Sequence, residues 1–190
     1  MRNVVKIVAL VSGFQGCVLP DRLISSADTE ALLPIAESLI DDFYSFDGAR
    51  LEQALASAGD SKESLLYYQG WAEGGNYEII ERKHCAVKSS NIVSCPIMVK
   101  DDPMLALAVD FFVTDTFEIT FEDMRVSSVE TSSNDLPIYY QARDWVRANM
   151  PELVAQPCEG FFAGGPTPGI CAQAMAEGYR HFTASDAYPR

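Results

Sequence analysis

Apolar residues recur at helical spacing in the first third of the chain. Five of them fall on one face of a helix: Leu32, Ala36, Leu39, Ile40 and Phe43. This repeat predicts an amphipathic helix capped by Asp28 and ended near Ser45. Two further helices are expected over 49–58 and 61–74, because glycines follow both stretches.

The middle of the chain follows a two-residue repeat instead. Residues 77–87 and 92–100 are rich in β-branched side chains and flank a polar turn, which predicts a hairpin. Phe117, Ile119 and Phe121 alternate with polar residues, and 126–131 returns as a partner strand. A last long helix is expected before Pro151. Helices followed by an antiparallel sheet indicate an α+β fold.

The N-terminus has the layout of a secretory signal. Arg2 and Lys6 precede an uncharged apolar run, and Gly16 stands directly before Cys17. The segment is similar to a bacterial lipoprotein signal, which implies cleavage before Cys17 and acylation of that cysteine. The alternative is a buried edge strand at 4–11.

The expected organisation follows from these patterns. We expect a signal peptide over 1–16, a tether over 17–27, an α+β domain over 28–150 and a C-terminal loop with a short helix over 151–190. The expected location is the bacterial cell envelope, with the protein held on the periplasmic side of the outer membrane through the lipid on Cys17.

The remaining four cysteines fall into two local pairs. Cys85 and Cys95 lie symmetrically about the hairpin turn, so they face each other across the strands. Cys158 and Cys171 enclose a loop rich in Gly and Pro. We expect two disulfides, Cys85–Cys95 and Cys158–Cys171, and therefore an oxidising compartment. The alternative is buried free thiols in a cytosolic protein.

Charge excludes one large class of function. Acidic residues outnumber basic ones 27 to 14, the formal net charge is −13 and the pI is about 4.4. Such a surface repels phosphate backbones, so we expect no nucleic-acid partner. Two histidines, no Cys-x-x-Cys and no phosphate-binding loop lead us to expect neither metal nor cofactor.

Several segments together resemble the nuclear transport factor 2-like superfamily, in its SnoaL-like bacterial branch. They are the helices ending at Trp71, the hairpin at 85–95 followed by Asp101-Asp102, the segment 116–126 and the tail over 145–153 and 158–168. The resemblance implies a curved antiparallel sheet wrapped around N-terminal helices, a cone-shaped α+β barrel with a pocket. Enzymes of that superfamily place an acid–base residue in such a pocket.

The acid–base candidates are His84, Asp110, Glu118, Tyr67, Tyr68 and Tyr77. His84 neighbours Cys85 in the predicted strand, so the two point to opposite faces, and we expect His84 inside the pocket. Asp110 stands in a strongly apolar stretch and is the second catalytic candidate. The adjacent pairs Asp41/Asp42, Asp101/Asp102 and Glu122/Asp123 are expected to be solvated helix or turn charges.

Aromatic residues complete the expected site. We expect Tyr44, Tyr67, Trp71 and His84 to line a pocket for a small apolar molecule. The preferred function is an exported module that binds a small molecule or a protein partner without catalysis. The alternative is an isomerase, cyclase or dehydratase of the SnoaL-like kind. Contact with a membrane is expected only through the lipid anchor, and a homodimer stays open.

Overall fold

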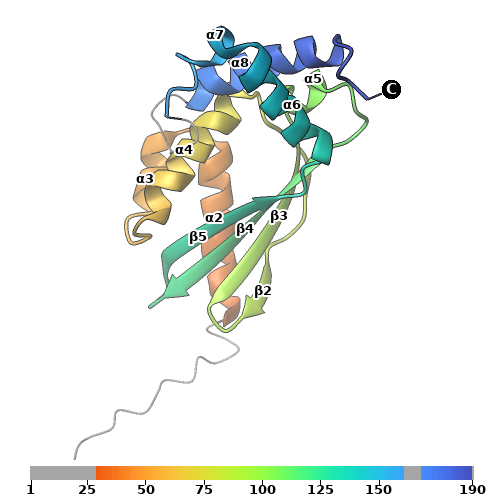
Figure 1. The fold of residues 1–190 in the computed structure, drawn as a ribbon. Coiled ribbons are helices and arrows are strands. Elements are labelled where there is room, and N and C mark those ends of the chain that lie inside the picture. The colour runs from red at the N-terminus through yellow and green to blue at the C-terminus, as the bar shows by residue number, and fades with distance from the viewer. Residues whose placement is uncertain (1–28, 161–167, 190) are drawn as a thin grey trace, which may run out of the picture.

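The computed structural model describes residues 29–160 and 168–189, and it shows helices packed on one face and one end of a sheet (Figure 1). The expected signal, the tether and Cys17 lie outside the described residues. The helices α2 (Leu32–Tyr44), α3 (Gly48–Ala54) and α4 (Ser61–Gly74) precede the sheet. Their order matches the prediction.

The sheet is antiparallel, five-stranded and open across the described residues. Its strands are β1 (Glu78–Arg82), β2 (Ala86–Ser89), β3 (Ile92–Lys100), β4 (Val113–Glu122) and β5 (Arg125–Ser133). The hydrogen-bonded order is β1-β3-β4-β5, and β2 also pairs with β3. The α+β class is therefore confirmed, with an open sheet in place of a closed barrel.

The predicted strand over 77–87 is two strands. β1 pairs with the second half of β3, through Glu78 opposite Lys100, and β2 pairs with the first half, through Ala86 opposite Ser94. The chain leaves the sheet at 83–85 between them. A long central strand can hold two short neighbours on the same edge, and a repeat of apolar residues does not reveal that interruption.

The core lies between α2 and the inner face of the sheet. Alternate residues of β4 are buried, and its inward stripe includes Phe117 and Ile119. On α2, Leu39 and Phe43 are buried in the same core, and the ring centroids of Phe43 and Phe117 are 5.0 Å apart. This buried stripe fixes which face of β4 its other inward-pointing side chains occupy.

Four helices cover the end of the sheet where β3 finishes and β4 begins: α5 (Asp102–Ala106), α6 (Pro137–Asn149), α7 (Pro151–Val154) and α8 (Pro168–Thr183). α8 packs against α4 with almost no space between the backbones. A Cβ added at Gly74 would stand 2.2 Å from the carbonyl oxygen of Gly169. Only glycine permits that approach, which fixes α4 beneath α8.

Both predicted disulfides are present. Cys85 is bonded to Cys95 and Cys158 to Cys171, with Cα separations of 4.3 and 4.6 Å. Disulfides persist in oxidising compartments, so the protein belongs to an extracytoplasmic location. Over the residues that the structure describes, none of the helices has both the length and the apolar character to cross a membrane.

Candidate functional site

A pocket of about 200 Å³ opens where the helical end of the molecule meets the sheet. It is lined from α4, from the N-terminus of α5, from β4, from the last residues of β5 and from α6. The side chains that carry chemistry there are Tyr68, Trp71, Tyr77, Asp101, Asp115, Asp135 and Tyr139. The pocket therefore joins carboxyl groups to an aromatic wall.

Asp115 stands in the inward stripe of β4, among apolar neighbours on the same face. Its side chain is only 1% exposed. Burial raises the pKa of Asp115 to about 7, although a hydrogen bond from the Tyr68 hydroxyl lowers it; the negative charges of Asp135 and Asp101 add to the rise. One carboxyl oxygen, Oδ2, has no hydrogen-bond partner within the described residues.

Asp101 reaches the same pocket from the end of β3. Its Oδ1 accepts a hydrogen bond of 2.9 Å from the backbone N–H of Met104 and so caps α5. Burial raises the pKa of Asp101 to about 7, against the lowering effect of that bond, and Asp135 and Asp102 raise it further. Its Oδ2 is buried and lacks a hydrogen-bond partner in the part of the chain that is described.

The aromatic wall is tied to these carboxyls. The rings of Tyr68 and Tyr77 meet edge to face, with centroids 6.3 Å apart. Trp71 is buried and its side chain hydrogen-bonds to Tyr77. Burial raises the pKa of Tyr77 well above its usual value, and the charges of Asp101 and Asp115 add to that effect. The tyrosines of the wall are therefore neutral at physiological pH.

The arrangement gives the pocket two chemical abilities. Two carboxyls with pKa values of about 7 can each give or take a proton at neutral pH. When ionised, these two buried carboxyls form a region of concentrated negative charge. Among residues 29–160 and 168–189, no group of three or more His, Cys, Asp or Glu side chains could hold a metal ion.

His84 lies elsewhere. It stands in the exposed connection between β1 and β2, its side chain is fully exposed, and its Nδ1 is 3.8 Å from Oε1 of Glu37. The expectation that His84 enters the pocket is wrong, because residues 83–85 leave the sheet and the alternation of strand faces does not extend through them.

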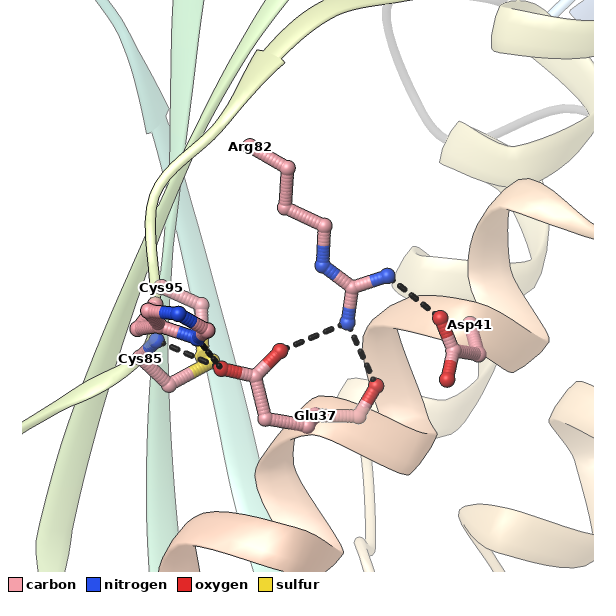
Figure 2. Close-up of a disulfide and its surroundings, with 6 residues drawn as sticks. Glu37, Asp41, Arg82, Cys85 and Cys95 are labelled. Atoms are coloured by element: carbon pink, nitrogen blue, oxygen red, sulfur yellow. Dashed lines mark hydrogen bonds and ion pairs between the residues drawn. A yellow bond between two sulfur atoms is a disulfide. The ribbon is translucent and has the colours of Figure 1, made fainter.

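The surroundings of His84 form a charged cluster that fastens β1 and the connection at 83–85 to α2 (Figure 2). Glu37 Oε1 accepts a hydrogen bond of 2.7 Å from the backbone N–H of Cys85, and its Oε2 lies 2.6 Å from Arg82 Nη2. Arg82 also pairs with Asp41. We call these residues, Glu37, Asp41 and Arg82, the Glu37 cluster.

The other predicted site residues are divided between the pocket and its surroundings. Trp71 lines the pocket, as expected. Tyr44 is close enough to Asp115 for that charge to raise its pKa, but its ring packs on Phe117 in the core. Tyr67 faces a surface depression beside α3. Asp110 is exposed in the connection before β4.

Sequence reasoning overlooked both buried carboxyls. Asp101 was expected to be a solvated turn charge, whereas it caps α5 from inside the fold. Asp115 had a signal that could have found it: the alternation of Phe117, Ile119 and Phe121, continued backwards by two residues, places an acid on the buried face. An acid in a buried stripe is a candidate functional group.

Comparison with known proteins adds no family to this geometry: no protein-family model, no curated protein and no solved structure matches the chain.

Proposed function

We propose that this protein is an exported module that binds a small molecule in the pocket around Asp101 and Asp115. The observation that carries the proposal is the pair of buried carboxyl oxygens without a hydrogen-bond partner among the described residues. Burying such a group costs about 1–3 kcal/mol or more. A fold tolerates that cost where a ligand supplies the missing partner.

The proposal changes the kind of ligand expected from the sequence. The pocket wall combines aromatic rings with carboxyls and with the hydroxyl-bearing residues Thr131, Ser132 and Ser133. A purely apolar molecule would leave both carboxyls unpaired, so the ligand we propose is polar.

The signal-like N-terminal sequence and the two disulfides support an envelope location. Within it we propose a periplasmic, outer-membrane lipoprotein anchored through Cys17. We also propose that the pocket corresponds to the conical cavity implied by the SnoaL-like resemblance, since helices and the inner face of the sheet both contribute to it. A homodimer stays a prediction.

Trp71 offers a direct test of binding. The chain has two tryptophans, and the other, Trp145, packs on Phe182 outside the pocket. In a Trp145→Phe variant, fluorescence excited at 295 nm therefore reports the pocket alone. A library of small polar metabolites should include molecules that shift this emission saturably. The same molecules should leave the Trp71 emission unchanged when Asp115→Asn is added to that variant. No saturable shift across the library would contradict the proposal.

One observation favours a second candidate, acid–base catalysis of the isomerase or lyase type. Two carboxyls with a pKa of about 7 in one pocket suit proton transfer at neutral pH. A small ketone such as cyclohexanone in D₂O tests it. The carboxylate would take an α-proton to leave the enolate, the resulting carboxylic acid would exchange that proton for deuterium with D₂O, and it would then return a deuteron to the enolate carbon. Deuterium incorporation above the rate of Asp115→Asn supports catalysis, and equal rates reject it.

A further inference from the structure

Aromatic rings from three parts of the chain line the pocket together with the carboxyls. Tyr68 and Trp71 come from α4, Tyr77 from the segment before β1, and Tyr139 from α6. Trp71 is almost fully buried and the three tyrosines are half-buried, so their rings form the wall. Asp101 and Asp115 lie deeper, at 2% and 1% exposure.

The electrostatics of such a wall favour one class of ligand. An aromatic face carries negative potential and attracts a cation placed over it. The two carboxyls, and the nearby Asp135, are negative when ionised. An anion would be repelled by every one of these groups. A neutral molecule would not neutralise the negative charge of the two ionised carboxylates.

The pocket also distinguishes between kinds of cation. A bare metal ion needs several oxygen or nitrogen ligands, and the described residues contain no such cluster. An alkylammonium group instead combines a diffuse charge with apolar methyl or methylene surface, which matches rings above carboxyls. A cavity of about 200 Å³ has room for a small alkylammonium compound.

We infer that the pocket is a site for a small organic cation, an alkylammonium compound, held over Tyr68, Trp71, Tyr77 and Tyr139 with its charge directed to Asp101 and Asp115. The inference rests on the proposed function and names its ligand class. Arg143, whose charge reaches Tyr139, lies over the ring of Tyr140 and pairs with Asp144, outside the pocket lining.

Binding should depend on pH through the two carboxyls. The titratable groups that face them are Asp135, Asp102, Tyr44, Tyr68, Tyr77 and Tyr139. Burial keeps the four tyrosines neutral. A permanent cation binds the ionised carboxyls, so below neutral pH it must displace a proton. For each proton that the cation displaces, its affinity should fall about tenfold with every pH unit below neutral.

Calorimetric titration of the full chain with choline and with 3,3-dimethylbutan-1-ol tests the inference. The alcohol has the shape of choline, with carbon in place of the charged nitrogen. Tetramethylammonium and methylammonium extend the test to smaller cations. We expect saturable binding of at least one cation, at least tenfold tighter than the alcohol, and weaker at pH 6 than at pH 8.

Matched variants locate the effect. Asp115→Asn and Asp101→Asn should each weaken cation binding tenfold or more, whereas Asp110→Asn removes the same charge from an exposed loop and should leave it unchanged. An asparagine side chain still offers an oxygen that can cap α5, so the Asp101→Asn variant keeps its fold. Equal binding of choline and the alcohol, or no binding of any of the three cations, would overturn the inference. The fluorescence screen on Trp71 decides the proposed function separately.

Discussion

Two groups of acidic residues in this protein are built in opposite ways. In the Glu37 cluster both oxygens of Glu37 have partners, Arg82 and the backbone of Cys85, and the side chain is 28% exposed. In the pocket, Asp101 and Asp115 are buried, and each has an oxygen without a hydrogen-bond partner among the described residues. The first group joins α2 to the sheet edge, and the second faces a cavity.

The difference appears in how readily each carboxyl ionises. Partial burial raises the pKa of Glu37, but the hydrogen bond from Cys85 and the charge of Arg82 outweigh it, and the net pKa is lowered. Burial raises the pKa of Asp115 to about 7 because it outweighs the hydrogen bond from Tyr68. A paired carboxylate stabilises the fold, whereas an unpaired buried one destabilises it and remains available to a ligand.

The largest effect should come from Asp115→Asn. The pKa of Asp115 rises from 3.8 to about 7 on folding, so the folded state holds a proton that the unfolded state has lost. Stability is therefore highest below pH 4 for this group and is lost as the pH rises to 7. This pKa difference of about three corresponds to a loss of roughly 4 kcal/mol in the free energy of unfolding. At pH 8 the variant should be more stable by up to that amount.

Urea unfolding at pH 5 and pH 8 measures this gain. The wild type should lose stability between the two values and Asp115→Asn should lose less. Asp110→Asn is the control, since its carboxyl is exposed. A variant less stable than wild type at pH 8 would show that the ionised carboxyl has a stabilising partner.

Removal of the disulfide beside the Glu37 cluster should come next in size. Cys85 and Cys95 are ten residues apart, and a loop of that length closed by a disulfide stabilises a fold by about 3 kcal/mol. We expect Cys85→Ala/Cys95→Ala to lower the unfolding free energy by that order, measured by urea titration. Ligand-induced emission of Trp71 should persist in the folded variant. Loss of that response would show that the two regions are coupled.

Glu37→Gln should have a smaller effect of the opposite sign to Asp115→Asn. The amide keeps an acceptor for Cys85 but loses the charge that pairs with Arg82, and a partly exposed ion pair is worth about 1 kcal/mol or less. Because the pKa of Glu37 is lowered, its stabilisation is present above about pH 4.5 and is lost as the pH falls below that. Unfolding curves from pH 3 to 7 should show the difference vanish at the acid end. A difference that grows in acid would contradict this.

The smallest effect should come from the β4–β5 turn, which lies at the opposite end of these strands from the pocket. Asp123 and Met124 both have positive φ, 48° and 61°, a conformation that glycine adopts without strain. We expect Met124→Gly to raise the unfolding free energy by about 0.5–1 kcal/mol, independent of pH. A pH-dependent change in thermal unfolding would be inconsistent with a purely local backbone effect.

The sequence revealed the elements that depend on local patterns. Helical repeats located α2 and α4, and symmetry about a turn paired Cys85 with Cys95. The sequence did not reveal that residues 83–85 are unpaired. β1 and β2 pair with different halves of the long strand β3, and that arrangement depends on tertiary structure rather than on the local pattern. That interruption is why His84 is exposed.

The site itself was harder to predict because its two carboxyls are buried by tertiary contacts. Asp101 has the sequence signature of a helix cap, and such residues are usually solvated. Only the arrival of α4 and α6 over the end of the sheet encloses it with Asp115. Trp71 was found because a large aromatic side chain on the apolar face of a helix usually packs into the fold.

The most direct test of this account is the titration of the aspartate side chains themselves. Carboxyl ¹³C chemical shifts of the folded protein, recorded from pH 3 to 9 and assigned with Asp101→Asn and Asp115→Asn, give the midpoint of each group. Two coupled midpoints near pH 7 are expected for Asp101 and Asp115. Addition of a bound alkylammonium ligand should move both midpoints down. Midpoints near pH 4 for Asp101 and Asp115 would contradict the account.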